Sequence, residues 1–219
     1  MKIDKDDLLN SILKSVEELD YIKVKDLPDI DLYMDQLTTF MDNKLKGTKR
    51  HEEDKVLTKT MINNYAKNQV LPPPAKKQYS KYHILTLVFI YYFKNILSIT
   101  DIQKLLQPIN DKYYSEDGYS IADIYSEVFT LESGAKKKII NDVKEIVASS
   151  KEIFNGDDIE DKEFLQYFAI ICGLSFDIYI KKLVVEAMVD ELEGPQNKTK
   201  ASKDKKKDSS KASKKKSSK

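Results

Sequence analysis

Side chains that can bond to base edges and phosphates are concentrated between residues 58 and 79. Asparagine can pair with adenine in the major groove, threonine can contact thymine, and lysine can reach guanine or a phosphate. On one short helix these residue types would form a surface that reads duplex DNA. The candidate DNA-binding residues are Thr58, Lys59, Thr60, Asn63, Asn64, Tyr65, Lys67, Lys76, Lys77 and Tyr79.

The basic charge of the chain is local. Residues 43–82 carry 10 Lys and Arg against 3 acidic residues, a net charge of +7. Residues 1–42 carry 5 Lys against 11 acidic residues, and residues 83–197 carry 11 against 20. A basic island within an acidic body suits a partner that is a polyanion, because lysine and arginine displace counterions from phosphates.

The basic island and the residues within it also have a second interpretation. A run of charges can also be solvated surface, and a composition rich in lysine and asparagine can reflect an AT-rich genome. Tyr65 and Tyr79 would either contact phosphates through their hydroxyls or pack in the core. The scarcity of arginine, with Arg50 alone, favours A·T pairs in any direct reading of bases.

The sequence offers no catalytic or metal-binding arrangement. His51 is followed four residues later by Lys55, where a zinc-protease helix would have its second histidine. We expect a surface or capping role for His83 and a buried apolar role for Cys172. The acidic residues Asp157, Asp158, Glu160, Asp161 and Glu163 lack the spacing and glycine of a calcium loop and favour the start of a helix. We therefore predict a protein that is not an enzyme and has no metal or cofactor.

The apolar spacing predicts an all-α fold that positions these side chains. Apolar residues recur at spacings of three and four over 4–20 and 31–46. Thr58 would cap a short helix that ends near Asn68, Ser80 would cap a central buried helix, and a helix from Ser98 would close at Pro108. Long helices follow over about 120–154, with a bend near Ser133 and Gly134, and over 161–192. No strand pattern is visible, and the Lys- and Ser-rich segment 197–219 is expected to be disordered.

These elements, taken in order, resemble a known DNA-binding domain. The run 58–74 with Thr58, Tyr65 and the Leu71-Pro-Pro-Pro step, then Tyr79-Ser80 and the Leu- and Ile-rich helix up to Leu106, resembles the helix-turn-helix DNA-binding domain of MerR-family regulators. With 31–36 included, the stretch 27–106 is similar to an uncharacterised Firmicute family known only as a domain of unknown function. The resemblance implies a recognition helix at 58–68 and a role in transcription regulation.

The chain departs from the MerR pattern at the recognition helix and the wing. Asn63 and Asn64 stand where such domains have an arginine and an aromatic residue, and Gln69 stands where they have glycine. Asn68 would then make the turn, because asparagine tolerates the left-handed conformation. Four residues, 75–78, separate the prolines from Tyr79, so the wing should be rudimentary or absent.

The final helix carries a repeat of seven that is typical of helix pairing. Apolar residues recur at intervals of seven at Phe164, Ile171, Ile178 and Val185. Leu174 and Met188 fall three residues after Ile171 and Val185. We predict a homodimer through these six residues, which also matches the C-terminal dimerisation helix of MerR-like proteins. Alternatively, the helix packs within the chain on the helix of Ile139, Val143, Ile146 and Val147.

The predicted organisation has four parts and one proposed activity. An N-terminal docking helix (1–26) precedes a MerR-like domain (27–110), a helical oligomerisation region (111–196) and the tail (197–219). We expect a sequence-specific DNA-binding regulator that is soluble, cytoplasmic and associated with the nucleoid. The alternative is a helical protein-interaction module that keeps the helix-turn-helix fold, because a fold does not fix a function.

Overall fold

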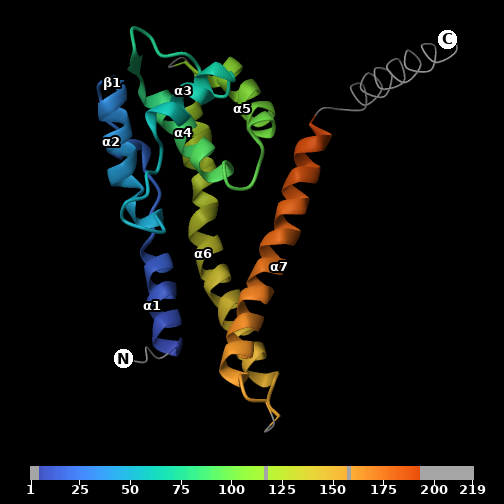
Figure 1. Cartoon of the computed structure of the whole chain (residues 1–219). Helices are drawn as coiled ribbons and strands as arrows, with labels where there is room; N and C mark the ends of the chain where they lie inside the picture. Colours follow the sequence, from blue (N-terminus) through green and yellow to red (C-terminus); the bar gives the residue numbers. More distant parts are fainter. Residues whose placement is uncertain (1–4, 116–117, 157–158, 193–219) are drawn as a thin grey trace, which may run out of the picture. The chain divides into compact units, whose positions relative to one another are not determined.

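The computed structural model describes residues 5–115, 118–156 and 159–192 (Figure 1). Over these residues the chain forms seven α-helices and one two-stranded sheet. The expectation of a mostly helical fold is confirmed, but the expectation of no strands is wrong. The segment 197–219, predicted to be disordered, lies outside the described residues.

The chain divides into two compact units, residues 1–177 and residues 178–219. Short strands and single helical turns connect the helices of the first unit, and α7 (Lys162–Glu191) runs through both units. The other elements in chain order are α1 (Lys5–Glu18), η1 (Val24–Asp26), β1 (Leu32–Tyr33), α2 (Met34–Lys44), η2 (Lys46–Thr48), α3 (Lys59–Lys67), β2 (Gln78–Tyr79), α4 (Lys81–Phe93), α5 (Ile99–Tyr113) and α6 (Ile121–Glu152).

α4 is the central helix of the first unit, as its apolar residues on all sides predicted. Its residues 82–90 are all buried, which requires neighbours around the whole helix. These neighbours include β2, α5 and α6. α4 therefore fixes the positions of the elements on either side of it.

An aromatic cluster joins α4 to the first turns of α6. The ring of Tyr125 lies 4.3 Å from that of Phe129 and 5.4 Å from that of Phe89, measured between centroids. The Tyr125 hydroxyl donates a hydrogen bond of 2.7 Å to the carbonyl of Ile22, which precedes η1. Because a buried hydroxyl needs a partner, this bond fixes the N-terminal segment against α6.

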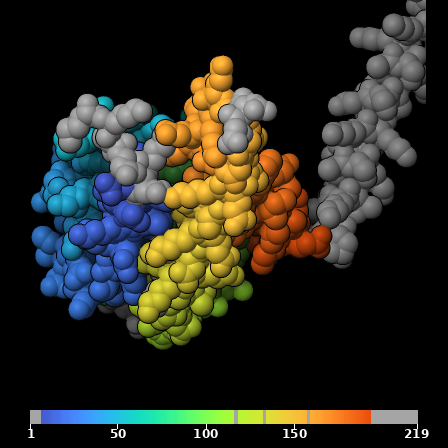
Figure 2. Space-filling view, turned by 90° about the horizontal axis from the view of Figure 1, so that it is seen from below, coloured from blue at the N-terminus to red at the C-terminus, as the bar shows by residue number. Residues whose placement is uncertain are grey.

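α1 packs against α6, and Figure 2 shows the two helices side by side on one face of the molecule. Leu13 is its buried residue. The Lys136 ammonium of α6 donates to the carbonyl of Leu19, just beyond the end of α1. The amphipathic N-terminal helix thus packs on α6 through part of its apolar stripe, while Leu8 and Ile12 of that stripe are exposed.

α5 continues through Pro108, which corrects the prediction that this proline closes the helix. A proline inside a helix removes one backbone hydrogen bond and costs about 3 kcal/mol. The residues beyond Pro108 are held by contacts with other parts of the first unit. The Asn110 amide donates to the carbonyl of Val70 at 3.2 Å, and the Tyr114 ring packs 5.5 Å from that of Tyr82.

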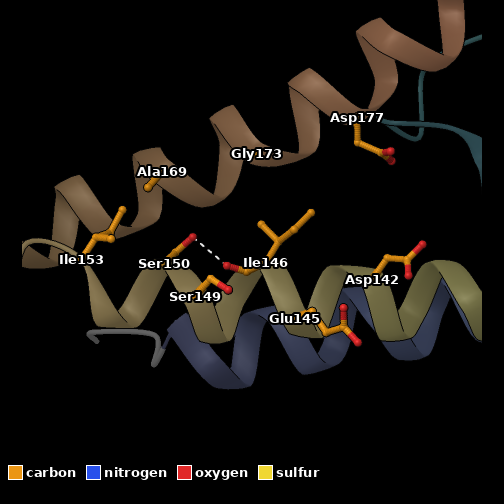
Figure 3. Close-up of a pocket in the computed structure, with 9 residues that line it drawn as sticks. All are labelled: Asp142, Glu145, Ile146, Ser149, Ser150, Ile153, Ala169, Gly173 and Asp177. Atoms are coloured by element: carbon orange, nitrogen blue, oxygen red, sulfur yellow. Dashed lines mark hydrogen bonds between the residues drawn. The ribbon is translucent and has the colours of Figure 1, made fainter.

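The first half of α7 packs closely on α6 at Gly173. A Cβ at this glycine would lie 2.9 Å from the Ile146 side chain, so only glycine fits without a shift. Figure 3 shows Ile146 projecting toward α7 in front of Gly173. Cys172 next to it is partly exposed, which corrects the expectation of a buried residue. Among the described helices, none is both long enough and apolar enough to cross a membrane.

Candidate functional site

The exposed face of α3 brings four of the predicted DNA-binding side chains together. Thr60, Asn63, Asn64 and Lys67 are all exposed and follow each other at spacings of three, one and three residues, which places them on one side of a helix. The opposite side carries Ile62 and Tyr65, both buried. α3 is therefore anchored by its apolar side and presents a polar surface about two turns long.

Thr58 caps this helix, as predicted. Its hydroxyl oxygen accepts the backbone N–H of Met61 at 3.2 Å. Lys59 forms an exposed ion pair with Asp35 of α2. Both side chains thus have partners within the chain and hold the start of α3, while the four residues on the exposed face lie further along it.

The end of α3 is set by Gln69, which corrects the prediction that Asn68 makes the turn. Gln69 has φ of 57°, whereas Asn68 has φ of −89°. Val70 N donates to Tyr65 O at 2.9 Å and Gln69 N to Ala66 O at 3.1 Å, and this pair of bonds requires the left-handed residue one position after the C-cap. Asn68 instead donates from its amide to the side-chain oxygen of Asn64 at 2.9 Å.

Tyr65 and Tyr79 lie in the core. Their exposed fractions are 6% and 3%, and burial raises the pKa of both hydroxyls. Of the two roles considered for them, the structure supports packing. Tyr79 pairs with Leu32 in the antiparallel register of β1 and β2, so its contribution to the site is to hold β2 in place.

Lys76 and Lys77 form a tight turn just before β2. Their φ values are 50° and 64°, and Gln78 N donates to Ala75 O at 2.8 Å. Two successive left-handed residues are typical of a type I′ hairpin turn, where Asn-Gly is the favoured pair. Where a rudimentary or absent wing was predicted, the structure has this two-residue turn, with two lysines in a conformation that is unfavourable for residues with a Cβ.

A buried polar cluster that the sequence did not reveal supports this turn. His83 is 6% exposed, and its Nδ1 accepts the backbone N–H of Ser80 at 3.0 Å. The rings of Tyr79 and Tyr114 lie edge-on to the imidazole at 5.5 and 5.3 Å. Of the two roles expected for His83, capping is confirmed and a surface position is wrong. Burial lowers the pKa of His83, opposed by the carbonyls of Pro73 and Pro72 and by Asp31.

Comparisons with known proteins cover the part of the chain that holds this site. Residues 22–128 match the family described as a domain of unknown function, DUF1836. The expected similarity to an uncharacterised family is confirmed over this DUF1836 segment, which runs from the residue bonded by Tyr125 to the second turn of α6. No curated protein and no solved structure matches the chain.

The DUF1836 segment contains all ten predicted DNA-binding residues, and the six predicted dimerisation residues lie beyond it on α7. In the first unit Phe164 and Ile171 are 62% and 48% exposed, and Leu174 is partly buried. In the second unit Ile178 and Met188 are exposed and Val185 is partly buried. Within the described residues, no cluster of His, Cys, Asp or Glu side chains could hold a metal ion.

Proposed function

We propose that the chain binds duplex DNA in a sequence-specific way and regulates transcription, with α3 as the recognition helix of a MerR-like helix-turn-helix. The observation that carries this proposal is the exposed face of α3, where Thr60, Asn63, Asn64 and Lys67 lie together. These are residue types that bond to base edges in the major groove, and a helix fits that groove. Such a protein would work on the nucleoid, in the cytoplasm.

The Lys76–Lys77 turn supplies the proposed contact with the phosphate backbone. It follows α3 by eight residues, and β1 and β2 hold its base. Left-handed conformations of residues other than glycine persist where the surrounding structure enforces them, and they gather at functional sites. Two strained lysines at a tip are more costly than the favoured Asn-Gly pair, and the two positive charges give a functional reason for keeping them.

The test of this function combines site selection with salt dependence. Selection of bound duplexes from a random pool with the full chain should enrich an A·T-rich site, whose affinity falls steeply with salt. Lys76→Ala with Lys77→Ala should lower the slope of log affinity against log salt by up to about two units. Lys137→Ala with Lys138→Ala, which removes the same charge from exposed positions of α6, should leave the slope unchanged. A pool without enrichment would count against sequence-specific binding.

We also propose that the protein is a homodimer through α7. Ile171 lies two residues before Gly173, so these positions are about 200° apart around the helix, and Gly173 is the position that contacts α6. Phe164 and Phe168 share the side of Ile171, and all three are about half exposed or more. The first half of α7 thus has one apolar side on α6 and a second apolar side that is exposed among the residues that the structure describes.

The size of this uncovered side fits association with a second copy. A large aromatic residue offers roughly 200 Å², so Phe164, Phe168 and Ile171 expose on the order of 300 Å² together. That is as much as the largest apolar patch of many monomers, and more than a third of the ~800 Å² that each subunit gives to a standard interface. Two recognition helices related by a two-fold axis would match a pseudo-palindromic site.

A protein-interaction module is the second candidate function, and the same apolar side of α7 is the observation in its favour. In that case α7 would bind another protein, and α3 would be polar surface without a role in DNA binding. Site selection separates the two functions, because the module would enrich no DNA site.

A further inference from the structure

A small basic pocket lies between the segment 48–56, which follows α2, and the C-terminal end of α4. Its volume is about 210 Å³. Four cationic side chains line it, from Lys49, Arg50, Lys55 and Lys94, against one carboxylate, from Asp54. The nearby carboxylate of Asp42 pairs with Lys49 at 2.7 Å and also accepts the N–H of Val56 at 3.2 Å. A positive excess of about two charges therefore remains at the pocket.

Lys94 is partly buried, and the partners that the structure gives its ammonium carry no full negative charge. Its ammonium donates to the carbonyl of Val56 at 2.8 Å and lies 4.7 Å from the centre of the Tyr91 ring. These partners and the C-terminus of α4 offer partial negative charge only. Burial lowers the pKa of Lys94, and no carboxylate opposes that shift. A partly buried ammonium without a full counter-charge is stabilised when an anion binds beside it.

The other lining groups suit an oxyanion. Arg50 offers a planar fork of N–H donors that matches phosphate geometry. The hydroxyls of Thr48 and Tyr91 are hydrogen-bonded to each other and line the same pocket. Asp54 accepts the backbone N–H of His51 at 3.0 Å and so is held by its own loop. A tetrahedral anion such as phosphate has enough oxygens to pair with three cations at once, whereas a carboxylate has only two oxygens.

We propose that this pocket binds a phosphate group, with Lys94 and Arg50 as its main ligands and Lys55 at its edge. The phosphate could belong to a small phosphorylated molecule or to the DNA backbone. Lys55 also lines a shallow pocket with Thr58 and Lys59 at the start of α3, so DNA on α3 would pass close to it. Only this second source rests on the proposed function.

Inorganic phosphate is the probe for the binding itself. At constant ionic strength, phosphate at ten times its Kd should raise the melting temperature of the full chain by about 3 °C relative to chloride. Isothermal titration calorimetry should show one site. Lys94→Met, which keeps much of the packing, and Arg50→Gln, at an exposed position, should each weaken phosphate at least tenfold. Lys137→Met on α6 should have no effect. Equal shifts in phosphate and chloride, or full binding by both pocket variants, would overturn the proposal.

Duplex DNA then separates the two sources. If the backbone supplies the phosphate, Arg50→Gln should lower the salt slope of DNA binding by about one unit, and phosphate should compete with DNA. If a small molecule supplies it, the variant should lose phosphate binding and keep the DNA affinity of the wild type. A chain that binds phosphate in the pocket but no DNA would contradict the proposed function and leave this site intact.

Discussion

Among the residues of α3, Asn63 offers the clearest test of the proposed base recognition. The amide of its neighbour Asn64 is engaged by Asn68, so Asn63 is the better candidate for a bidentate bond to adenine. Asn63→Ala should cost about 1–3 kcal/mol of binding free energy on the selected site and almost nothing on random DNA. Fluorescence anisotropy with both duplexes measures this difference.

The control for Asn63 is Asn141→Ala, the same change at an exposed position of α6. It should leave both affinities unchanged. If Asn63→Ala weakens the selected and the random duplex equally, α3 contacts DNA without reading bases.

Lys76 and Lys77 should lower the stability of the fold while they strengthen DNA binding. Replacing Lys76 by Asn and Lys77 by Gly gives the pair that a type I′ turn favours, and relief of left-handed strain should raise the free energy of unfolding by about 1 kcal/mol. The same variant should bind DNA more weakly, because two positive charges are gone. Urea denaturation and a salt titration measure the two effects.

Gln69→Gly is the matched control for strain. Gln69 is also left-handed, so glycine there should stabilise the fold by a similar amount and leave the salt slope unchanged. A Lys76→Asn, Lys77→Gly variant that is less stable than the wild type would show that the lysines are favourable to folding.

At the scale of residues, local rules predicted what depends on neighbours in sequence. The cap at Thr58 was predictable because its hydroxyl bonds three residues ahead. The left-handed residue was placed one position too early, at Asn68, because residue preference outweighed the pattern of bonds at the helix end. The choice between phosphate contact and packing for Tyr65 and Tyr79 needed the tertiary structure, because burial is set by distant residues.

The capping histidine of α4 should make stability depend on pH. Burial lowers the pKa of His83 below its ordinary value of 6.5, so the unfolded chain takes up the proton at a higher pH than the folded chain does. The stabilisation is complete above pH 6.5 and is lost as pH falls toward the folded pKa, at up to about 1.4 kcal/mol per pH unit. Denaturation curves between pH 7.5 and 5 test this.

His83→Asn isolates the effect, since an asparagine oxygen can replace Nδ1 as acceptor for Ser80 N and does not titrate. Its stability should change little over this range, whatever its absolute value. His51→Asn, at an exposed histidine, should retain the dependence of the wild type. Loss of that dependence in His51→Asn as well would contradict the assignment of the effect to His83.

At the scale of elements, the periodic helices were predictable and the exceptions were tertiary. β1 and β2 have two residues each, too few to show alternation. Beyond Pro108, Asn110 and Tyr114 contact the segment after α3 and helix α4, respectively, and no local signal in the sequence records these contacts. The ring contacts of His83 likewise join a helix cap to Tyr79 of β2 and to Tyr114, the C-cap of α5.

The dimer is a prediction about the whole molecule. Phe164→Asp with Ile171→Asp places charges on the uncovered side of α7 and should turn a dimer into a folded monomer. Light scattering at tens of micromolar gives the mass, and circular dichroism shows whether the helices remain. Leu131→Asp with Ile139→Asp, at exposed apolar positions of α6, should leave the mass unchanged. A monomeric wild type would contradict the dimer.

The arrangement of helices in space went beyond what the sequence could predict. The apolar repeat of α7 was visible, but it did not show which side would meet α6. The close approach at Gly173 shows which side meets α6. The sequence could not predict this, because a glycine inside a helix does not by itself mark a contact between helices. The predicted dimerisation residues included Leu174, which is partly buried, and did not include Phe168, which is exposed.

The bond between Tyr125 and Ile22 also bears on how the protein is made. It joins residues 103 positions apart, so the core around α4 stays open until the start of α6 has been synthesised. At about 5–20 residues per second, the ribosome needs roughly 5–20 s to pass from one residue to the other. In the later part of that time α3 and the turn after it are already present in a nascent chain whose central helix still lacks its aromatic cover.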